Sequence, residues 1–459
     1  MALSVALVIG YFTVLGFVAL RARAAREYAE FSLARQALPL ALIFGSLCAA
    51  YVGPGFSIGF VGRGFHSGLL FLCVGLAYAC QNILVGIFIA PRLRSLTDCH
   101  TLGDAIGQKY NRACQVLAGV ISVGLCAGFA AVMANAAGVV IQGVFHIPLW
   151  AAVTLAVIMA ALYMSFGGLK ASVMTDALQF TLFSILMPGM FLFLLIRVLN
   201  DSAATFTREL VTATSAGFRS TSSIEVVGLI AAFFLGETLI PPYANRALAT
   251  QTTSASRNSF ILGGMFSTLW FTMMVSLGIV ARTIVPEGTS EDRVLLTLIK
   301  TTMPMAGYTL LLVALISVIM SSLDSLLNAG AVAFTEDLVK PFARISDKTA
   351  LVCGRLATVG MAVLAAVAAV AMPSIIEGLL ICYTIWAPAI LPAAVLGLWL
   401  KKPRPWAGFL SMVAGATAAL SFQFIWPDVV GIPAILLALA VSLAAYLLGH
   451  VLGGLAEGR

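Results

Sequence analysis

Charged residues are scarce in this chain. Asp, Glu, Lys and Arg make up 10% of its 459 residues, whereas soluble globular proteins carry about 25%. Hydrophobic residues reach 61% and the mean hydropathy is +1.04. This composition excludes a soluble fold, and no stretch is polar enough for a separate water-soluble domain. We therefore expect residues 1–459 to form a single, all-α transmembrane domain.

The residue patterns of common enzyme and metal sites are also missing. The 4 histidines lie in loops or at the ends of apolar runs, and the 8 cysteines include no CxxC pair. No phosphate-binding loop or Ser/His/Asp pattern is present. The net charge of +7 sits in short loops rather than on a soluble basic face. We predict no enzyme activity, no nucleic-acid partner and no obligate protein partner.

Apolar runs long enough to cross a bilayer recur along the whole chain. They predict thirteen spans: 2–22, 38–60, 66–92, 113–143, 147–166, 172–199, 224–248, 257–284, 305–334, 350–371, 373–399, 406–424 and 431–453. An odd number of spans puts the two termini on opposite sides of the membrane.

The basic residues orient these spans. With the N-terminus outside, nineteen of the 26 Lys and Arg residues, Arg246 included, fall on the inner side. The positive-inside rule therefore predicts an external N-terminus and a cytoplasmic C-terminus in the cell's inner (plasma) membrane.

Two spans carry residues that interrupt helices. Gly53-Pro54-Gly55 lies near the middle of span 38–60, and Pro241-Pro242 lies two-thirds of the way along span 224–248. Proline removes a backbone donor and glycine tolerates unwound geometry, so we expect both spans to be discontinuous. Broken backbone at membrane depth persists only where it lines a cavity.

The two interrupted spans are five apart, and each begins a block of five, 38–199 and 224–399. Because five is odd, the second block is inverted relative to the first. This pattern is typical of inverted-repeat secondary transporters. The remaining spans are one extra N-terminal helix, 2–22, and two C-terminal helices within 406–453.

Several segments resemble the sodium/solute symporter family, which includes sodium/glucose, sodium/proline and choline cotransporters. Residues 167–179, GGLKASVMTDALQ, resemble the family signature, and residues 320–340, MSSLDSLLNAGAVAFTEDLVK, resemble its eighth core helix and exit loop. Residues 48–62 and 235–246 are most similar to the choline transporter branch. The resemblance implies a LeuT-like 5+5 fold of about thirteen helices and sodium as the coupling ion.

The resemblance also implies ion-binding residues. The main sodium site would use the Ser321 and Ser322 hydroxyls together with backbone oxygens of Ala49, Val52 and Val318. Sodium is a hard cation, for which hydroxyl and carbonyl oxygens are suitable ligands. The alternative is that the two serines only form hydrogen bonds within or between helices.

A second ion site is implied at Asp176, Asp324 and Ser325. Asp176 could instead cap its helix or pair with Lys170. Each acid needs an explanation because a carboxylate at mid-membrane costs about 2.5–3.5 kcal/mol on insertion scales.

Glu237 departs from the choline branch, where a small residue is expected. It could pair with a substrate ammonium, carry a proton or bond to a neighbouring helix. Tyr51, Tyr78 and Phe129 match aromatic positions that face the solute in that branch. Aromatic faces attract cations, so these three rings favour an amine-bearing solute, and Glu237 would add a countercharge.

The sequence therefore predicts a sodium-coupled symporter that imports a small organic solute, with an amino acid or amine-bearing zwitterion favoured. The expected partners are the solute, sodium and the lipid bilayer. One alternative is a proton-coupled symporter of a monocarboxylate, because Asp176, Glu237 and Asp324 could relay protons. Another is a membrane sensor built on a transporter scaffold.

Overall fold

The computed structural model describes residues 2–21, 25–372, 374–427 and 431–457. Residues 22 and 373, at the edges of two predicted spans, lie outside this part. Within it the chain is built from helices, and the first ones are α1 (Ala2–Arg21), α3 (Leu40–Tyr51), α4 (Phe60–Ser67), α5 (Leu70–Phe88), α8 (Arg112–Phe145) and α9 (Leu149–Ser220). They continue with α10 (Ser223–Leu235), α11 (Pro241–Ala249), α12 (Thr253–Ala281), α13 (Glu291–Thr302), α14 (Met305–Ala333), α15 (Asp347–Ala369), α16 (Ile375–Trp399), α17 (Pro405–Leu420) and α18 (Ala434–Glu457).

The predicted spans 147–166 and 172–199 fall within one element, α9, which has 72 residues. A straight helix of this length would measure about 108 Å, far more than a bilayer core of about 30 Å. Gly168 lies at the boundary between the two spans and has a left-handed φ of 58°. A side chain there would meet the Phe31 carbonyl oxygen at 2.4 Å, so only glycine fits this position. The left-handed backbone at Gly168 therefore interrupts α9 between the two predicted spans.

The expected loop after this span is helical. We expected residues 200–223 to lie outside the spans as a connection, but α9 continues to Ser220. Ser222 and Glu225 then form a capping box that begins α10. A polar segment after an apolar run does not require the helix to end there.

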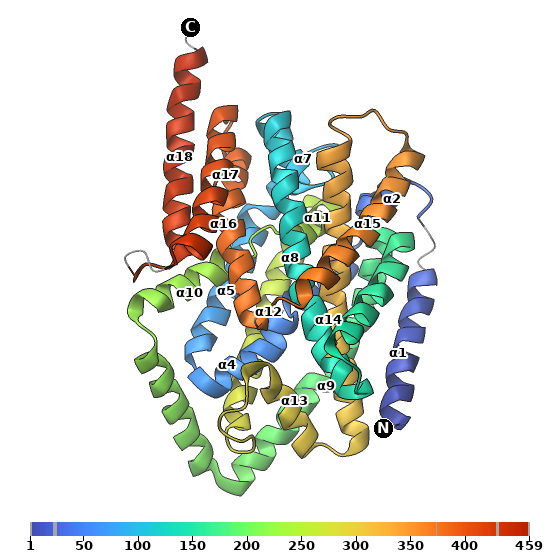
Figure 1. Cartoon of the computed structure of the whole chain (residues 1–459), viewed down its shortest axis with the longest axis vertical. Helices are drawn as coiled ribbons and strands as arrows, with labels where there is room; N and C mark the ends of the chain where they lie inside the picture. Colours follow the sequence, from blue (N-terminus) through green and yellow to red (C-terminus); the bar gives the residue numbers. More distant parts are fainter. Residues whose placement is uncertain (1, 22–24, 373, 428–430, 458–459) are drawn as a thin grey trace.

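The helices are arranged around α14. Of the residues in its most apolar window, 94% are buried, against 28% for α17 and for α18. Figure 1 shows α1 at one edge of the molecule and α17 and α18 at the opposite edge. This arrangement matches the expected core with one helix before it and two after it. α1 begins near one end of the long axis and α18 ends near the other, as an odd number of crossings requires.

The short helices α2 (Tyr28–Leu33), α6 (Ala90–Arg94) and α7 (Leu102–Lys109) lie in the connections. A buried polar cluster joins α7 to the π-helical turn 334–339 that follows α14. Thr101 Oγ1 donates a 2.7 Å hydrogen bond to Asp337, and Gln115 Nε2 donates one of 2.6 Å to Asp104. Burial, reinforced by the negative charge of Glu336, raises the pKa of the Asp104 carboxyl to about 7.

Candidate functional site

The first predicted break is present in span 38–60. α3 ends at Tyr51, Val52 has a non-helical ψ of 25°, and the following helix is bent by 58°. The Ser57 hydroxyl donates a 2.6 Å hydrogen bond to the Val52 carbonyl oxygen. A carbonyl has two lone pairs, so this oxygen retains one for another ligand.

The second predicted break is present in span 224–248. α10 ends at Leu235 and α11 begins at Pro241, which leaves a link of five residues between two helices. Leu239 in this link has a left-handed φ of 55°. Trp386 of α16 donates a 2.9 Å hydrogen bond to the freed Thr238 carbonyl. Both broken spans are therefore confirmed.

A small cavity of about 30 Å³ lies between the two breaks. It is lined by residues of α3, α8, α11, α14 and α16 and of the links, among them Ala50, Gly53, Phe129, Glu237, Tyr243 and Ser322. This volume is about that of one water molecule. At this size the cavity has room for an ion or a water, and an organic solute would need more space.

One of the two proposed sodium ligands of α14, Ser322, meets the first break at this cavity. A Cβ on Gly53 would lie only 2.9 Å from Ser322 Oγ, so the serine hydroxyl is close to the unwound backbone. Ser322 Oγ also donates a long 3.4 Å hydrogen bond to the Val318 carbonyl. The other, Ser321, is buried beside the Asp176 carboxyl. Hydroxyl groups close to freed carbonyls are ligands that suit a hard cation.

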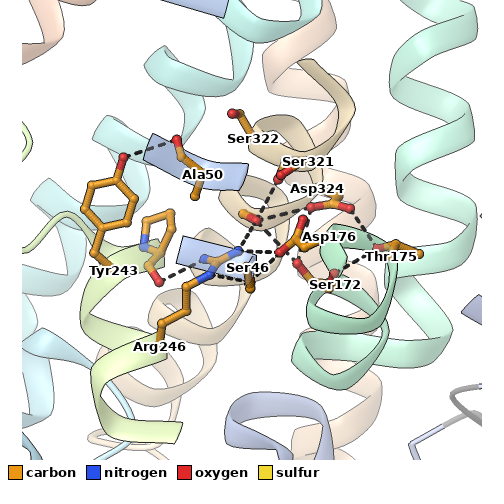
Figure 2. Close-up of polar contacts among 12 residues, drawn as sticks. Ser46, Ala50, Ser172, Thr175, Asp176, Tyr243, Arg246, Ser321, Ser322 and Asp324 are labelled. Carbon is orange, nitrogen blue, oxygen red and sulfur yellow. Dashed lines mark hydrogen bonds and ion pairs between the residues drawn. The ribbon is translucent and has the colours of Figure 1, made fainter. Parts of the chain in front are cut away.

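Asp176 is held by a network in which Arg246 is the cation (Figure 2). Both side chains are fully buried and their ion pair measures 2.8 Å. The Arg246 guanidinium also donates to the Ser46 hydroxyl of α3 at 2.7 Å and to the Ser325 hydroxyl of α14 at 2.6 Å. A third bond, of 3.0 Å, goes to the Pro242 carbonyl of its own helix. Arg246, which we had counted among the inner loop charges, therefore lies inside the protein.

Asp176 does not pair with Lys170, one of the two structural roles considered for it. Lys170 lies 3.5 Å from Glu30 instead. Asp176 follows Lys170 by six positions, whereas side chains that meet on a helix are three or four positions apart. The two side chains therefore point in different directions on α9.

Asp324 is fully buried and is surrounded by hydroxyl groups. Tyr163 donates a 2.9 Å hydrogen bond, and Ser172, Ser325 and Thr175 donate longer ones of 3.2, 3.2 and 3.4 Å. The proposed second ion site is therefore assembled from α9 and α14. Besides the two carboxyl groups, the site contains the Arg246 guanidinium, which the sequence analysis did not place there.

Glu237 lies in the link of the second break and accepts hydrogen bonds from three tyrosines. Tyr78 Oη is 2.5 Å from Oε2, Tyr243 Oη is 2.6 Å from the same oxygen, and Tyr383 Oη is 2.6 Å from Oε1. We call Glu237 and these tyrosines the tyrosine cage. Within the part of the chain that the structure describes, no salt bridge to Glu237 is found.

The other predicted aromatic residues lie around this cage. The Tyr51 ring is 4.8 Å from the ring of Tyr243, and the Phe129 ring is 5.6 Å from that of Tyr383. Tyr51, Tyr78 and Phe129 thus lie around Glu237, and of these three Phe129 lines the cavity whereas Tyr51 and Tyr78 do not. Tyr243 and Tyr383 were not foreseen.

A cavity between two broken helices is typical of a secondary transporter. The model of the sodium:solute symporter family matches residues 32–415. This chain belongs to that family, and it is therefore a multi-pass membrane transporter rather than an enzyme.

Characterised relatives agree with this assignment. A sodium/glucose cotransporter of Vibrio parahaemolyticus is 24% identical over 434 residues, which cover 86% of this chain and 79% of that protein. A sodium/pantothenate symporter of Haemophilus influenzae is 26% identical, with 47% of this chain and 45% of that protein covered. The osmoregulated proline transporter OpuE of Bacillus subtilis is 35% identical over a shorter region, 24% of this chain and 23% of that protein.

Solved structures share the fold. A sodium-coupled sialic acid symporter in a substrate-bound outward-open state superposes with a TM-score of 0.84 at 15% identity, covering 98% of both chains. Mhp1, a nucleobase-cation-symport-1 family transporter in a closed conformation, gives 0.62 at 11% identity over 94% of both chains. The LeuT-like fold of about thirteen helices is thereby confirmed.

Proposed function

We propose that this protein is a sodium-coupled symporter that imports a small organic solute by alternating access. The observation that supports this proposal is the close approach of the Ser322 hydroxyl of α14 to the unwound backbone at Gly53. Hydroxyl groups and freed carbonyls there supply oxygens of the kind that sodium prefers. The protein would work in the cell's inner (plasma) membrane with its N-terminus outside.

The solute carries an amine in this proposal. Glu237 lines the cavity, so its carboxylate is not turned away from the space that a solute would enter. Its three hydrogen bonds come from neutral tyrosine hydroxyls, which leave its negative charge without a countercharge. A primary or secondary ammonium would supply both the charge and further donors. Of the relatives' solutes, proline has an amine of this kind, whereas glucose and pantothenate do not.

Purified protein in liposomes tests the proposal. Uptake of radiolabelled amino acids, betaine-like zwitterions and monocarboxylates is measured with an inward sodium gradient and with potassium in its place. We expect uptake of an amine-bearing solute that requires sodium. Equal uptake in both salts would exclude sodium coupling, and uptake driven by an inward proton gradient alone would favour a proton relay through Asp324, whose partners are all hydroxyls.

A thermal-shift measurement selects the compounds beforehand. A ligand that binds only the folded protein raises the melting temperature by an amount set by its concentration and affinity. The expected solute raises the melting temperature more in sodium than in potassium. A monocarboxylate that does so, with no effect of any amine, would contradict the amine assignment while leaving sodium coupling intact.

A further inference from the structure

Arg246 connects four helices at one level of the molecule. It belongs to α11, and its guanidinium reaches Ser46 of α3, Asp176 of α9 and Ser325 of α14 at 2.6 to 2.8 Å. Ser46 also donates a hydrogen bond to the same Asp176 oxygen, so the α3–α9 contact is direct as well. Figure 2 shows Arg246, Asp176 and Ser46 converging below the cavity residue Ala50. We call Arg246, Asp176, Ser46 and Ser325 the arginine clamp.

The arginine clamp lies next to the cavity, toward the face where α3 begins and α11 ends. Ser46 is one helical turn from the cavity residue Ala50, and Arg246 is one turn from the cavity residue Pro242. In both helices that turn leads away from the break. Our count of basic residues puts this face in the cytoplasm, and we refer to it as the inner face.

The clamp joins the two half-helices that border any inner pathway. α3 is the half of its span on the inner side of the first break, and α11 is the half on the inner side of the second. Ser46 and Arg246 hold these halves to each other, while Asp176 and Ser325 hold them to α9 and α14. A solute leaving the cavity toward the inner face must pass this level.

The clamp also contacts the proposed ion site. Asp176 uses Oδ2 for Arg246 and Ser46. Its carboxyl also neighbours the buried hydroxyl of Ser321. An ion held by Ser321 would therefore lie close to the carboxylate that retains Arg246.

We propose that Arg246 closes the inner gate of this transporter, and that release of solute to the inner face requires its guanidinium to leave Asp176 and Ser46. This proposal builds on the transport function proposed above. A fully buried, multiply bonded arginine suits such a role because its planar fork holds several partners in one geometry. Separation of α3 and α11 then exposes these groups to water, which replaces the bonds lost in opening.

Cysteine labelling tests the gate without a known solute. Ala50→Cys places a thiol in the cavity, and a membrane-impermeant maleimide is applied from the inner face with inside-out vesicles or from the outer face with right-side-out vesicles. The parent chain without Ala50→Cys measures background labelling of the eight native cysteines. Arg246→Gln removes the charge of the clamp, and Ser46→Ala removes one of its hydroxyls.

The matched control is Arg282→Gln. Arg282 pairs with Glu209 at 2.9 Å and both side chains are largely buried, but neither residue lines the cavity. We expect Arg246→Gln to raise the rate of labelling from the inner face at least about threefold, because loss of the clamp shifts the population toward open states. Ser46→Ala should give a smaller rise. Arg282→Gln should leave the rate unchanged, and labelling from the outer face should not rise.

The outcomes separate a gate from a structural ion pair. If Arg246→Gln and Ser46→Ala lower the melting temperature but label at the parent rate, the clamp is structural and the proposal is wrong. Faster labelling from both faces, or an equal rise in Arg282→Gln, would also contradict it. If Arg246→Gln does not reach the membrane, Ser46→Ala decides the question alone. None of these readouts depends on sodium or solute, so a failure of sodium coupling would be recognised separately.

Discussion

Glu237 and Tyr383 are 146 residues apart in the chain, yet the Tyr383 hydroxyl donates a 2.6 Å hydrogen bond to Glu237 Oε1. This bond connects the link of the broken span to α16. Tyr78 of α5 and Tyr243 of α11 complete the tyrosine cage on the other carboxylate oxygen. The Glu237 side chain is therefore held at the cavity by neutral donors from three helices.

Glu237→Gln should abolish most uptake of the solute while leaving the protein folded. The change keeps the shape and removes the charge, so a hydrogen bond to an ammonium loses its charge assistance, about 1.5–3 kcal/mol or a tenfold or greater loss of affinity. Initial uptake rates at several solute concentrations measure it. Glu209→Gln, which removes a carboxylate paired with Arg282 away from the cavity, is the control. Unchanged uptake in Glu237→Gln would refute the amine assignment.

Tyr383→Phe should weaken solute binding less than Glu237→Gln does. It removes one of the three hydroxyls and leaves Glu237 Oε1 without that donor, which costs about 1–3 kcal/mol when the group stays buried. We expect a raised KM and a modestly lowered melting temperature. Tyr446→Phe is the control, because its hydroxyl is in a 3.0 Å pair with Tyr110 among α17 and α18 and not at the cavity. Equal effects on KM in both variants would mean that the cage has no special role.

The helices could be predicted from the sequence because their signal is local. Runs of about 20 apolar residues mark the crossings, and Gly53-Pro54-Gly55 and Pro241-Pro242 mark the breaks. The helical segment that ends at Ser220 was missed because hydropathy reports where a chain leaves the membrane, not whether the polar segment that follows is helical.

The site could be predicted only in part. Ser321 and Ser322 were proposed from the family resemblance, whereas Asp176 and Glu237 drew attention because acids within apolar spans need an explanation. Their partners come from distant parts of the chain, and spacing carries no information on which residues meet. Arg246 had a usable signal, because it lies inside the predicted span 224–248 and a buried acid needs a cation. Counting it among the loop charges obscured that signal.

Ser321→Ala and Ser322→Ala should each raise the sodium concentration needed for half-maximal uptake, by about tenfold. Loss of one ligand oxygen from a small set weakens a hard cation directly. At saturating sodium the KM for the solute should change much less. Ser317→Ala is the control on the same helix, because the Ser317 hydroxyl donates a 2.8 Å hydrogen bond to Val313. A sodium dependence like that of the parent in both variants would exclude these ligands.

Asp104→Asn should change how stability depends on pH. The folded carboxyl keeps its proton to a pH of about 7, because burial and the charge of Glu336 raise its pKa. The unfolded carboxyl loses its proton near a pH of about 3.9. Between these values the folded state binds more protons, so this group lowers the free energy of unfolding as pH rises. The Asn side chain does not titrate in this range. The melting temperature of the variant minus that of the parent should therefore be greater at pH 8 than at pH 5, by about 2 °C or more. The prediction is wrong if the difference in melting temperature between variant and parent is the same at pH 5 and at pH 8.

Gly53→Ala tests the close approach on which the proposed sodium site depends. A Cβ at this position would lie 2.9 Å from Ser322 Oγ and 3.7 Å from Ser322 Cβ, so the serine hydroxyl must move away from the break. We expect weaker sodium activation of uptake, similar in size to the effect of Ser322→Ala, together with a small loss of stability.

The control for this substitution is Gly124→Ala in α8. A Cβ on Gly124 has no atom within 4 Å, so alanine there meets open space and adds helix propensity of up to about 1 kcal/mol. Its sodium dependence should match that of the parent. The double variant Gly53→Ala with Ser322→Ala is the sharper comparison, because removing the hydroxyl that clashes leaves little for the new methyl group to displace. Its sodium dependence should be close to that of Ser322→Ala alone. A further loss in the double variant would show that Gly53 acts through the backbone of the break rather than through Ser322.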